Sequence, residues 1–316
     1  MARFQSWLLE RLRSDRVVAI LLLLPSIIAI AIFVYGFIGW TGYVSLSRWR
    51  TLLPDYHFVG TDNYERLSND FRFQSDIRNT IVFTALFLLS ATVLGFLAAA
   101  LLDQKIKGEA FFRGIFLFPM AISFIVTGIV WQWLFHPSSG LNLLSRKAGY
   151  DGPVPAWSTD ANVLLGFDLG KIEMGIPVAL LPVVVAATWQ LAGFTMAMYL
   201  AGIRGVPEEL REAARVDGAS EWEVYRRVVL PLLRPITLGV VVILGHISLK
   251  IFDLTVAMTG SGPNFTADMP AFYMFETTFR GNHFAVGAAI AVVLLFLVAT
   301  LVIPYLYFSL RREPAR

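Results

Sequence analysis

Three ionisable residues interrupt a long apolar stretch in the C-terminal part of the chain. His246, Lys250 and Asp253 follow an i, i+4, i+7 spacing, which places all three on one face if the stretch is a helix. A charge is costly in hydrocarbon, so this face must meet protein, water or a partner. It could line a pathway and contact solute hydroxyl groups, or Lys250 and Asp253 could neutralise each other and fix helix packing. The sequence leaves both interpretations open.

Aromatic and amide side chains in other apolar blocks form a second and weaker set of candidates. The set consists of Gln132, Trp189, Gln190 and Thr195. Aromatic rings and amides suit the faces and hydroxyl groups of sugars, but such residues also pack and hydrogen-bond between membrane helices. Packing is the favoured interpretation for these four residues.

Residue patterns that would support catalysis or metal binding are missing from the sequence. The chain has no cysteine, which excludes disulfides, thiol catalysis, cysteine-bound zinc and iron–sulfur clusters. No Gly-x-x-x-x-Gly-Lys-[Ser/Thr] P-loop occurs, so the chain should not bind ATP phosphates. No spacing of Ser, His and Asp assembles a catalytic triad or a metal site. We therefore expect a protein that is not an enzyme and that itself binds no metal or cofactor.

The elements that carry these residues should be membrane helices. Apolar residues make up 56% and aromatic residues 14% of the 316 positions, which exceeds an ordinary soluble domain. The apolar blocks reach the roughly 20 residues that cross a bilayer, which predicts an all-α, polytopic membrane protein with six transmembrane helices within residues 17–308. The predicted spans are 17–40, 77–102, 114–135, 177–203, 235–259 and 284–308. The long loop 136–176 could hold a small extracytoplasmic cap.

Basic residues set the expected orientation of these spans. Six crossings place the tails 1–16 and 309–316 and the loops 103–113 and 204–234 on one side, and these segments hold more Lys and Arg than the longer loops opposite. The positive-inside rule therefore predicts cytoplasmic termini and a cytoplasmic loop 204–234. The block 17–40 exceeds a signal-peptide core and lacks a cleavage site, so we expect it to be retained. The small net charge of +3 implies no nucleic-acid partner.

Loop 204–234 carries the clearest local signals in the chain. Pro207 suits the first turn of a helix, where its missing N–H costs nothing. Gly218 can adopt the left-handed conformation that ends a helix. Ser220 and Glu223 have the spacing of a capping box, which begins a second helix. The loop is therefore predicted to be a helix, a tight turn and a second helix.

One face of the first predicted helix could dock onto a partner. The face is defined by i, i+3, i+4 and i+7 spacing and consists of Leu210, Ala213, Ala214 and Asp217. Its small residues would permit close approach, as in a helix that lies in a groove of another protein. On these local signals alone, a solvated amphipathic loop is an equal alternative.

The same loop resembles the EAA motif of importer permeases of the ATP-binding-cassette (ABC) class. That motif reads Glu-Ala-Ala, three residues, Gly, nine residues, and then Ile-x-Leu-Pro. The chain has Glu-Ala-Ala at 212–214, then Gly218, and the final part with Val228 in place of Ile. The resemblance implies coupling to an ATPase through Glu212, Ala213, Ala214, Asp217, Gly218, Leu230 and Pro231.

Other segments resemble the sugar-importer permeases of the maltose and glycerol-phosphate type. The resemblance covers about residues 17–308 and is carried by segments 59–64, 79–80, 118–120, 131–133 and 259–263, together with Asp253. Ser261 replaces the middle glycine of the family's Thr-Gly-Gly-Gly-Pro stretch. Segments 271–274, 287–289 and 304–307 look most like glucose- and mannose-type permeases.

What the resemblance implies is a division of labour among several chains. Two homologous permeases would form the pathway for a sugar, glucose or a related monosaccharide. Two cytoplasmic subunits would bind ATP and Mg, and an extracytoplasmic binding protein would deliver the sugar. The chain would lie, in contact with lipid, in the cytoplasmic (inner) membrane of a bacterium or archaeon. The alternatives are an ion-driven secondary transporter, an ABC permease for a non-sugar solute such as glycerol-phosphate, and a non-transporting scaffold.

Overall fold

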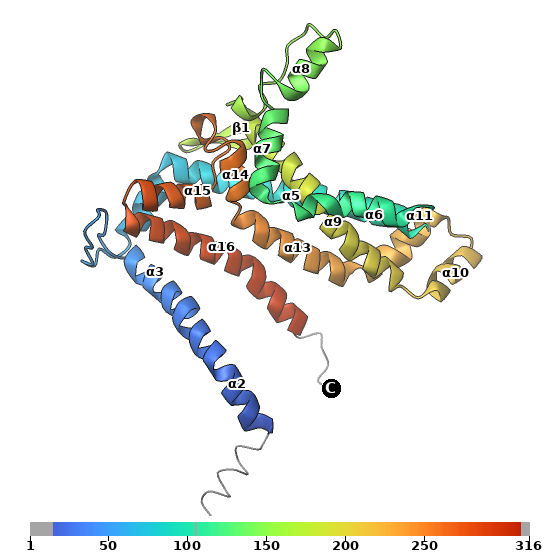
Figure 1. Cartoon of the computed structure of the whole chain (residues 1–316), viewed down its shortest axis with the longest axis horizontal. Coiled ribbons are helices and arrows are strands. Elements are labelled where there is room, and N and C mark those ends of the chain that lie inside the picture. The colour runs from blue at the N-terminus through green and yellow to red at the C-terminus, as the bar shows by residue number, and fades with distance from the viewer. Residues whose placement is uncertain (1–14, 105, 311–316) are drawn as a thin grey trace, which may run out of the picture.

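The computed structural model describes residues 15–104 and 106–310, which form an elongated assembly of helices (Figure 1). The predicted tails, 1–16 and 309–316, lie outside the described residues except for their innermost positions. The predicted cytoplasmic location of these tails therefore stays a prediction.

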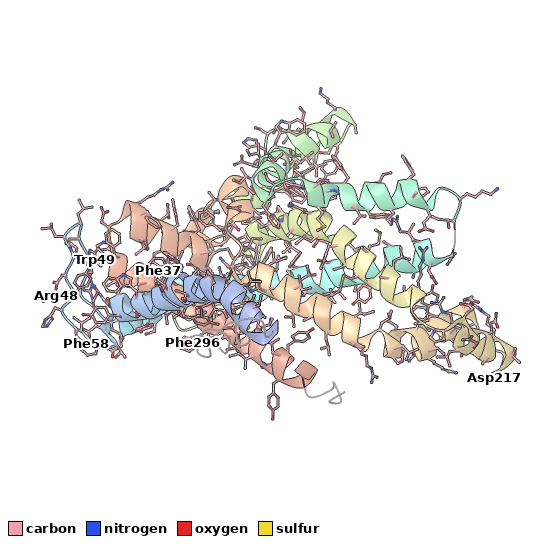
Figure 2. The ribbon with its side chains drawn as sticks, turned by 60° about the horizontal axis from the view of Figure 1, so that its bottom comes forward. Phe37, Arg48, Trp49, Phe58, Asp217 and Phe296 are labelled. Atoms are coloured by element: carbon pink, nitrogen blue, oxygen red, sulfur yellow. The ribbon has the colours of Figure 1, made fainter. Side chains whose placement is uncertain are left out.

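The two ends of the long axis carry different elements. A loop at residues 46–61 lies at one end, and helix α10 (Glu208–Val216) lies at the other (Figure 1). The labelled side chains of Arg48, Trp49 and Asp217 show the same separation from a second direction (Figure 2). Such a separation suits a protein whose ends lie on opposite sides of a membrane.

Four helical segments in the described part of the chain are long and apolar enough to cross a membrane. They are α2 (Asp15–Ile30) with η1 (Ala31–Gly36) and α3 (Phe37–Ser45), then α5 (Phe71–Asp103), α9 (Leu181–Arg204) and α16 (Phe284–Leu310). They match the first, second, fourth and sixth predicted spans. Helix α5 begins earlier than predicted because Asp70 caps it, accepting a hydrogen bond from the Phe73 N–H at 2.8 Å.

The outer surfaces of these helices are apolar. Phe37 on α3 is 59% exposed and Phe296 on α16 is 67% exposed (Figure 2). In the first segment, Val18–Ser45, none of the most apolar part is buried against the rest of the chain. Contiguous exposed apolar surface of this kind needs a cover of lipid or of another subunit.

The third predicted span, 114–135, is two helices and not one. The segment folds as α6 (Glu109–Leu117), the 3-10 turn η2 (Phe118–Ala121) and α7 (Phe124–Leu134). The two parts meet at 99°. Pro119 lacks the N–H that would extend α6, and Ser123 begins α7 by accepting a hydrogen bond from the Val126 N–H at 3.3 Å. If each bent helix pair is one span, the described residues provide up to six spans.

The fifth predicted span, 235–259, also breaks, so the predicted continuous helix is wrong there. It consists of α13 (Arg234–Leu249), a non-helical link and α14 (Asp253–Met258). In the link, Ile251 is buried and the Phe252 ring packs 5.5 Å from the Phe275 ring. Lys250 with φ of −116° and Phe252 with φ of −133° leave the helical region, so the tertiary structure overrides the helical propensity of the sequence here.

The core lies between α5 and α9, which pack closely because small residues face one another. A Cβ on Gly95 of α5 would collide with the Thr195 side chain of α9. A Cβ on Gly193 would collide with the Phe116 carbonyl group of α6. Glycine at these two places lets the helix backbones approach, as is common between membrane helices.

In the part of the chain that the structure describes, the predicted cap loop, 136–176, holds two β-strands, which depart from the all-α prediction. It contains helix α8 (Gly140–Lys147), which projects from the body in Figure 1, the 3-10 turn η3 (Trp157–Thr159) and an antiparallel hairpin of β1 (Val163–Leu169) and β2 (Ile172–Pro177). The hairpin is held to α5 by Arg78, whose Nη1 donates to the Glu173 carbonyl oxygen at 2.8 Å. The other short elements outside residues 204–234 are α4 (Asp62–Asn69), η4 (Val178–Leu180), η6 (Pro263–Phe265), α15 (Pro270–Phe275) and η7 (Glu276–Arg280).

Candidate functional site

The loop with the EAA spacing folds as two helices joined by a tight turn, as predicted. Helix α10 begins at Glu208, one residue later than the predicted start at Pro207. It ends at Val216, and the turn that follows contains Gly218, whose φ of +86° lies in the left-handed region. The Ala219 N–H then donates to the Ala214 carbonyl oxygen at 3.0 Å, which satisfies an otherwise unpaired carbonyl group at the helix end.

The second helix starts with the predicted capping box. The Glu223 N–H donates to Ser220 Oγ at 3.4 Å, and the Ser220 N–H donates to Glu223 Oε2 at 3.1 Å. The segment continues as α11 (Glu221–Val224), the π-helical η5 (Tyr225–Val229) and α12 (Leu230–Leu232). It meets α13 at 67°, and Leu230 and Pro231 lie, exposed, just before this bend.

The outer face of α10 is exposed and partly apolar. Leu210, Ala213 and Asp217 are exposed, as is Glu212, whereas Ala214 is half-buried against the core. Two large apolar side chains extend this surface, Val216 at 86% exposure and Trp222 of α11 at 66%. Asp217 marks the tip of the molecule in Figure 2. An apolar patch with a charged border, at the end of a membrane protein, is typical of a protein–protein contact.

Ion pairs brace the turn between α10 and α11. Arg215 lies 2.7 Å from Glu221 Oε1 and 3.0 Å from Glu208 Oε1. Arg215 donates hydrogen bonds to both carboxylates, and these bonds, first that to Glu221 and then that to Glu208, raise the pKa of Arg215 above its ordinary value. The turn therefore holds its shape while its outer face stays open.

The sequence analysis assigned no role to Arg211, the residue before Glu212. Its side chain points away from the exposed face and is buried, with 7% exposure. It pairs with Asp103 at the end of α5, at 2.8 Å. The only available signal was an arginine among exposed positions, because Asp103 is more than a hundred residues away in the sequence.

Two of the predicted pathway residues serve helix packing. Gln190 is buried, and its Nε2 donates to the Ile122 carbonyl oxygen at 2.7 Å, which ties α9 to the link between α6 and α7. Thr195 is fully buried and donates to the Ala91 carbonyl oxygen of α5 at 2.8 Å. Both contacts agree with the packing interpretation.

The other two residues of that set are exposed. Gln132 lies on α7, which packs against α14 where Gly128 meets Ala257. Trp189 lines a largely apolar cavity of about 530 Å³. Its ring lies 5.8 Å from that of Trp131, in an edge-to-face arrangement. These side chains are available to a solute or to a second subunit.

The ionisable set His246, Lys250 and Asp253 does not share one helical face. The break after Leu249 separates Asp253, the first residue of α14, from the other two residues. His246 lines an apolar groove between α13 and α16, whereas Lys250 and Asp253 are exposed. Among the ion pairs of the described residues, none joins Lys250 to Asp253, which argues against the alternative of a self-neutralising pair.

A partly buried ionic cluster at the opposite end was not predicted either. Arg72, in the first turn of α5, contacts Asp268 Oδ2 at 2.5 Å and Glu276 Oε2 at 2.6 Å. Its guanidinium group also lies over the rings of Phe265 and Tyr273, at 5.0 and 4.4 Å from the centroids. Burial raises the pKa of Asp268, although Arg72 opposes this shift. The cluster fastens α5 to the segment between α14 and α16.

Comparison with known proteins gives a consistent family assignment. The family "Binding-protein-dependent transport system inner membrane component" matches residues 91–313. A probable ABC transporter permease protein of Pyrococcus horikoshii is 41% identical over 295 residues, which are 93% of this chain and 96% of that protein. A xylose/arabinose import permease protein of Haloferax volcanii is 33% identical over 289 residues, 90% of this chain and 86% of its own.

A solved structure shares the fold. It is the crystal structure of a bacterial ABC transporter involved in the import of the acidic polysaccharide alginate, with a TM-score of 0.77 and 22% identity. The likeness covers 97% of this chain and 99% of that one. The family match spans more than half of the chain and confirms the resemblance inferred from the EAA spacing. The chain belongs to the inner-membrane components of binding-protein-dependent transport systems and is a permease subunit of an ABC importer.

Proposed function

We propose that this chain is one of two permease subunits that together form the pathway of an ATP-driven sugar importer. The observation that carries the proposal is the exposed outer face of α10, next to a braced turn at one end of the molecule. A secondary transporter would have no use for such a docking element. ATP and Mg would be bound by two partner ATPase subunits, since the sequence has no P-loop.

Docking would place α10 in a groove of the ATPase subunit. Leu210 and Val216 supply apolar contact, and Ala213 permits close approach of the partner backbone. Glu212 would meet a basic group at the edge of the groove, in a charge-assisted hydrogen bond of about 1.5–3 kcal/mol. Gly218 fixes the direction of the second helix, because a Cβ resists the left-handed conformation by about 1–2 kcal/mol.

The cargo that we propose is a monosaccharide or a close derivative, delivered by an extracytoplasmic binding protein. The Haloferax volcanii relative is a xylose/arabinose import permease, which favours a sugar over glycerol-phosphate. Exposed Trp189 and Gln132 offer the stacking and hydrogen-bonding groups that sugars need. The chain would act in the cytoplasmic membrane of a bacterium or archaeon.

Within this pathway, Lys250 and Asp253 would contact the passing sugar or water. Both are exposed at the break between α13 and α14, where freed backbone groups are tolerated if they line a cavity. Asp253→Asn should lower uptake while the assembled complex forms in normal amount. Normal uptake by this variant would exclude Asp253 from the pathway.

Co-purification of the ATPase subunit, with sugar uptake measured in parallel, tests the docking proposal. Glu212→Lys should release the ATPase subunit, Glu212→Gln should retain part of it, and Gly218→Val should weaken retention. The matched control is Asp151→Lys, which makes the same charge change at an exposed position of the predicted outer loop. If both Glu212→Lys and Gly218→Val retain the ATPase and the uptake of the wild type, this loop is not the coupling element.

A further inference from the structure

Helix α10 contacts the body of the protein through half-buried Ala214 and through the buried side chain of Arg211. Arg211 Nη1 lies 2.8 Å from Asp103 Oδ2, and Arg211 Nη2 donates to the Ile203 carbonyl oxygen at 2.6 Å. Glu208, on the same helix, lies farther from Nη1, at 3.8 Å. The two short contacts reach the last residue of α5 and the last turn of α9, the two helices that form the core.

A third element, η5, also contacts Asp103. Tyr225, the first residue of η5, donates from its hydroxyl group to Asp103 Oδ2 at 2.9 Å. One carboxylate oxygen therefore accepts from both Arg211 and Tyr225. The three side chains, defined here as the Asp103 joint, connect α10, the helix that follows it, and the ends of the two core helices.

The geometry of the Asp103 joint is suited to transmitting a movement of α10 to the ends of α5 and α9. Arg211 neutralises the negative end of α9, where carbonyl groups lack helical partners, and its planar fork fixes the direction of both contacts. Around it lies a cavity of about 990 Å³, lined by Glu209, Trp222 and the residues of the joint. Because α10 borders this cavity on the side of Arg211, the contacts of the joint form a polar connection between α10 and the ends of the core helices.

We infer that the Asp103 joint converts displacement of α10 by the ATPase into movement of α5 and α9, with Arg211 as the positioning residue. The inference rests on the proposed function, since it takes α10 to be the surface that the ATPase moves. It assigns to Arg211 a role distinct from docking, because its side chain faces away from the exposed surface. Loss of the joint should uncouple ATP hydrolysis from transport without releasing the ATPase.

The test uses the assembled importer in proteoliposomes, with sugar uptake and ATP hydrolysis measured on the same sample. Arg211→Met should keep the ATPase subunit bound and lower uptake per ATP about tenfold. Arg211→Lys keeps the charge but loses the second contact, so an intermediate ratio is expected. Asp103→Asn combined with Arg211→Met should be no worse than Arg211→Met alone, because both act through one contact.

Two further variants complete the test: one removes another contact of the joint, and the other is a control. Tyr225→Phe removes only a hydroxyl group and should lower uptake per ATP by a few-fold, even if Arg211→Met fails to assemble. Arg204→Met is the control, because Arg204 also pairs with a carboxylate at 2.8 Å, that of Glu109, without contacting the joint. Wild-type uptake per ATP in Tyr225→Phe and in every assembled Arg211 variant would overturn the inference. If the wild-type chain retains no ATPase subunit at all, the proposed function itself fails.

Discussion

The two ends of the molecule each hold α5 through an arginine ion pair that is at least partly buried, but the two ion pairs differ in what surrounds them. Arg72, at the start of α5, is enclosed by two acids and by aromatic rings of the same chain. Arg211 binds the other end of α5 beside a large cavity, on a helix whose outer face is exposed. The Arg72 contact is enclosed by groups of the same chain, whereas the Arg211 contact lies beside an open cavity and the exposed helix face that we propose as the docking surface.

The largest loss of stability is expected when Arg72 is replaced. Arg72→Met would leave the fully buried carboxylate of Asp268 without its counter-ion, and such a loss typically costs about 3–5 kcal/mol. We expect a marked drop in the thermal unfolding midpoint of the purified subunit, and partial recovery in Arg72→Met with Asp268→Asn. Arg48→Met, which removes an exposed pair with Asp55, should change little. Equal midpoints for Arg72→Met and Arg48→Met would show that the end near Arg72 is not locked.

A smaller effect is expected in the core that joins the two ends. Gly193→Ala directs a methyl group at the Phe116 carbonyl group, so α6 and α9 must separate, at a cost of about 1–3 kcal/mol. Gly39→Ala in α3 meets no other atom and should be neutral or slightly stabilising. Resistance to unfolding in detergent, compared between the two variants, measures the difference. Equal resistance would mean that the close approach of α6 and α9 is dispensable.

The smallest effect is expected at the partner-facing end. Ser220→Ala removes the helix cap, which is worth about 1 kcal/mol, and should weaken ATPase binding about fivefold. Ser220→Thr keeps the hydroxyl group and should bind nearly as the wild type does. Titration of detergent-solubilised permease with the ATPase subunit gives both affinities. An unchanged affinity in Ser220→Ala would show that the second helix does not need its cap for docking.

Local signals explain which parts of the fold could be predicted. The α10–α11 turn was predicted because Gly218 and the Ser220–Glu223 box act within a few residues of one another. The breaks at Ser123 and after Leu249 were missed, since Ser123 resembles any polar residue in a span and residues 250–252 contain neither Gly nor Pro. The hairpin was missed because its first strand is exposed along nearly all of its length.

The ion pairs of Arg72 and Arg211 could not be predicted, because their partners are distant in the sequence. Asp103 and Arg211 are paired by the tertiary fold, as are Arg72 and Asp268, and no spacing in the sequence brings them together. Conversely, the regular spacing of His246, Lys250 and Asp253 predicted a common face that the helix break removes. Spacing is therefore a guide to contacts within one helix and fails where the backbone bends.

The proposed cytoplasmic location of α10 is tested most directly by finding on which side of the membrane each end of the molecule lies. The chain has no native cysteine, so single cysteines at Asp217 and at Ser138, both exposed, can be labelled with a membrane-impermeant maleimide in intact cells and in inverted vesicles. We predict that Asp217→Cys is labelled only in inverted vesicles and Ser138→Cys only in intact cells. Labelling of both positions from the same side would contradict a cytoplasmic coupling helix and, with it, the proposed role of this end of the permease.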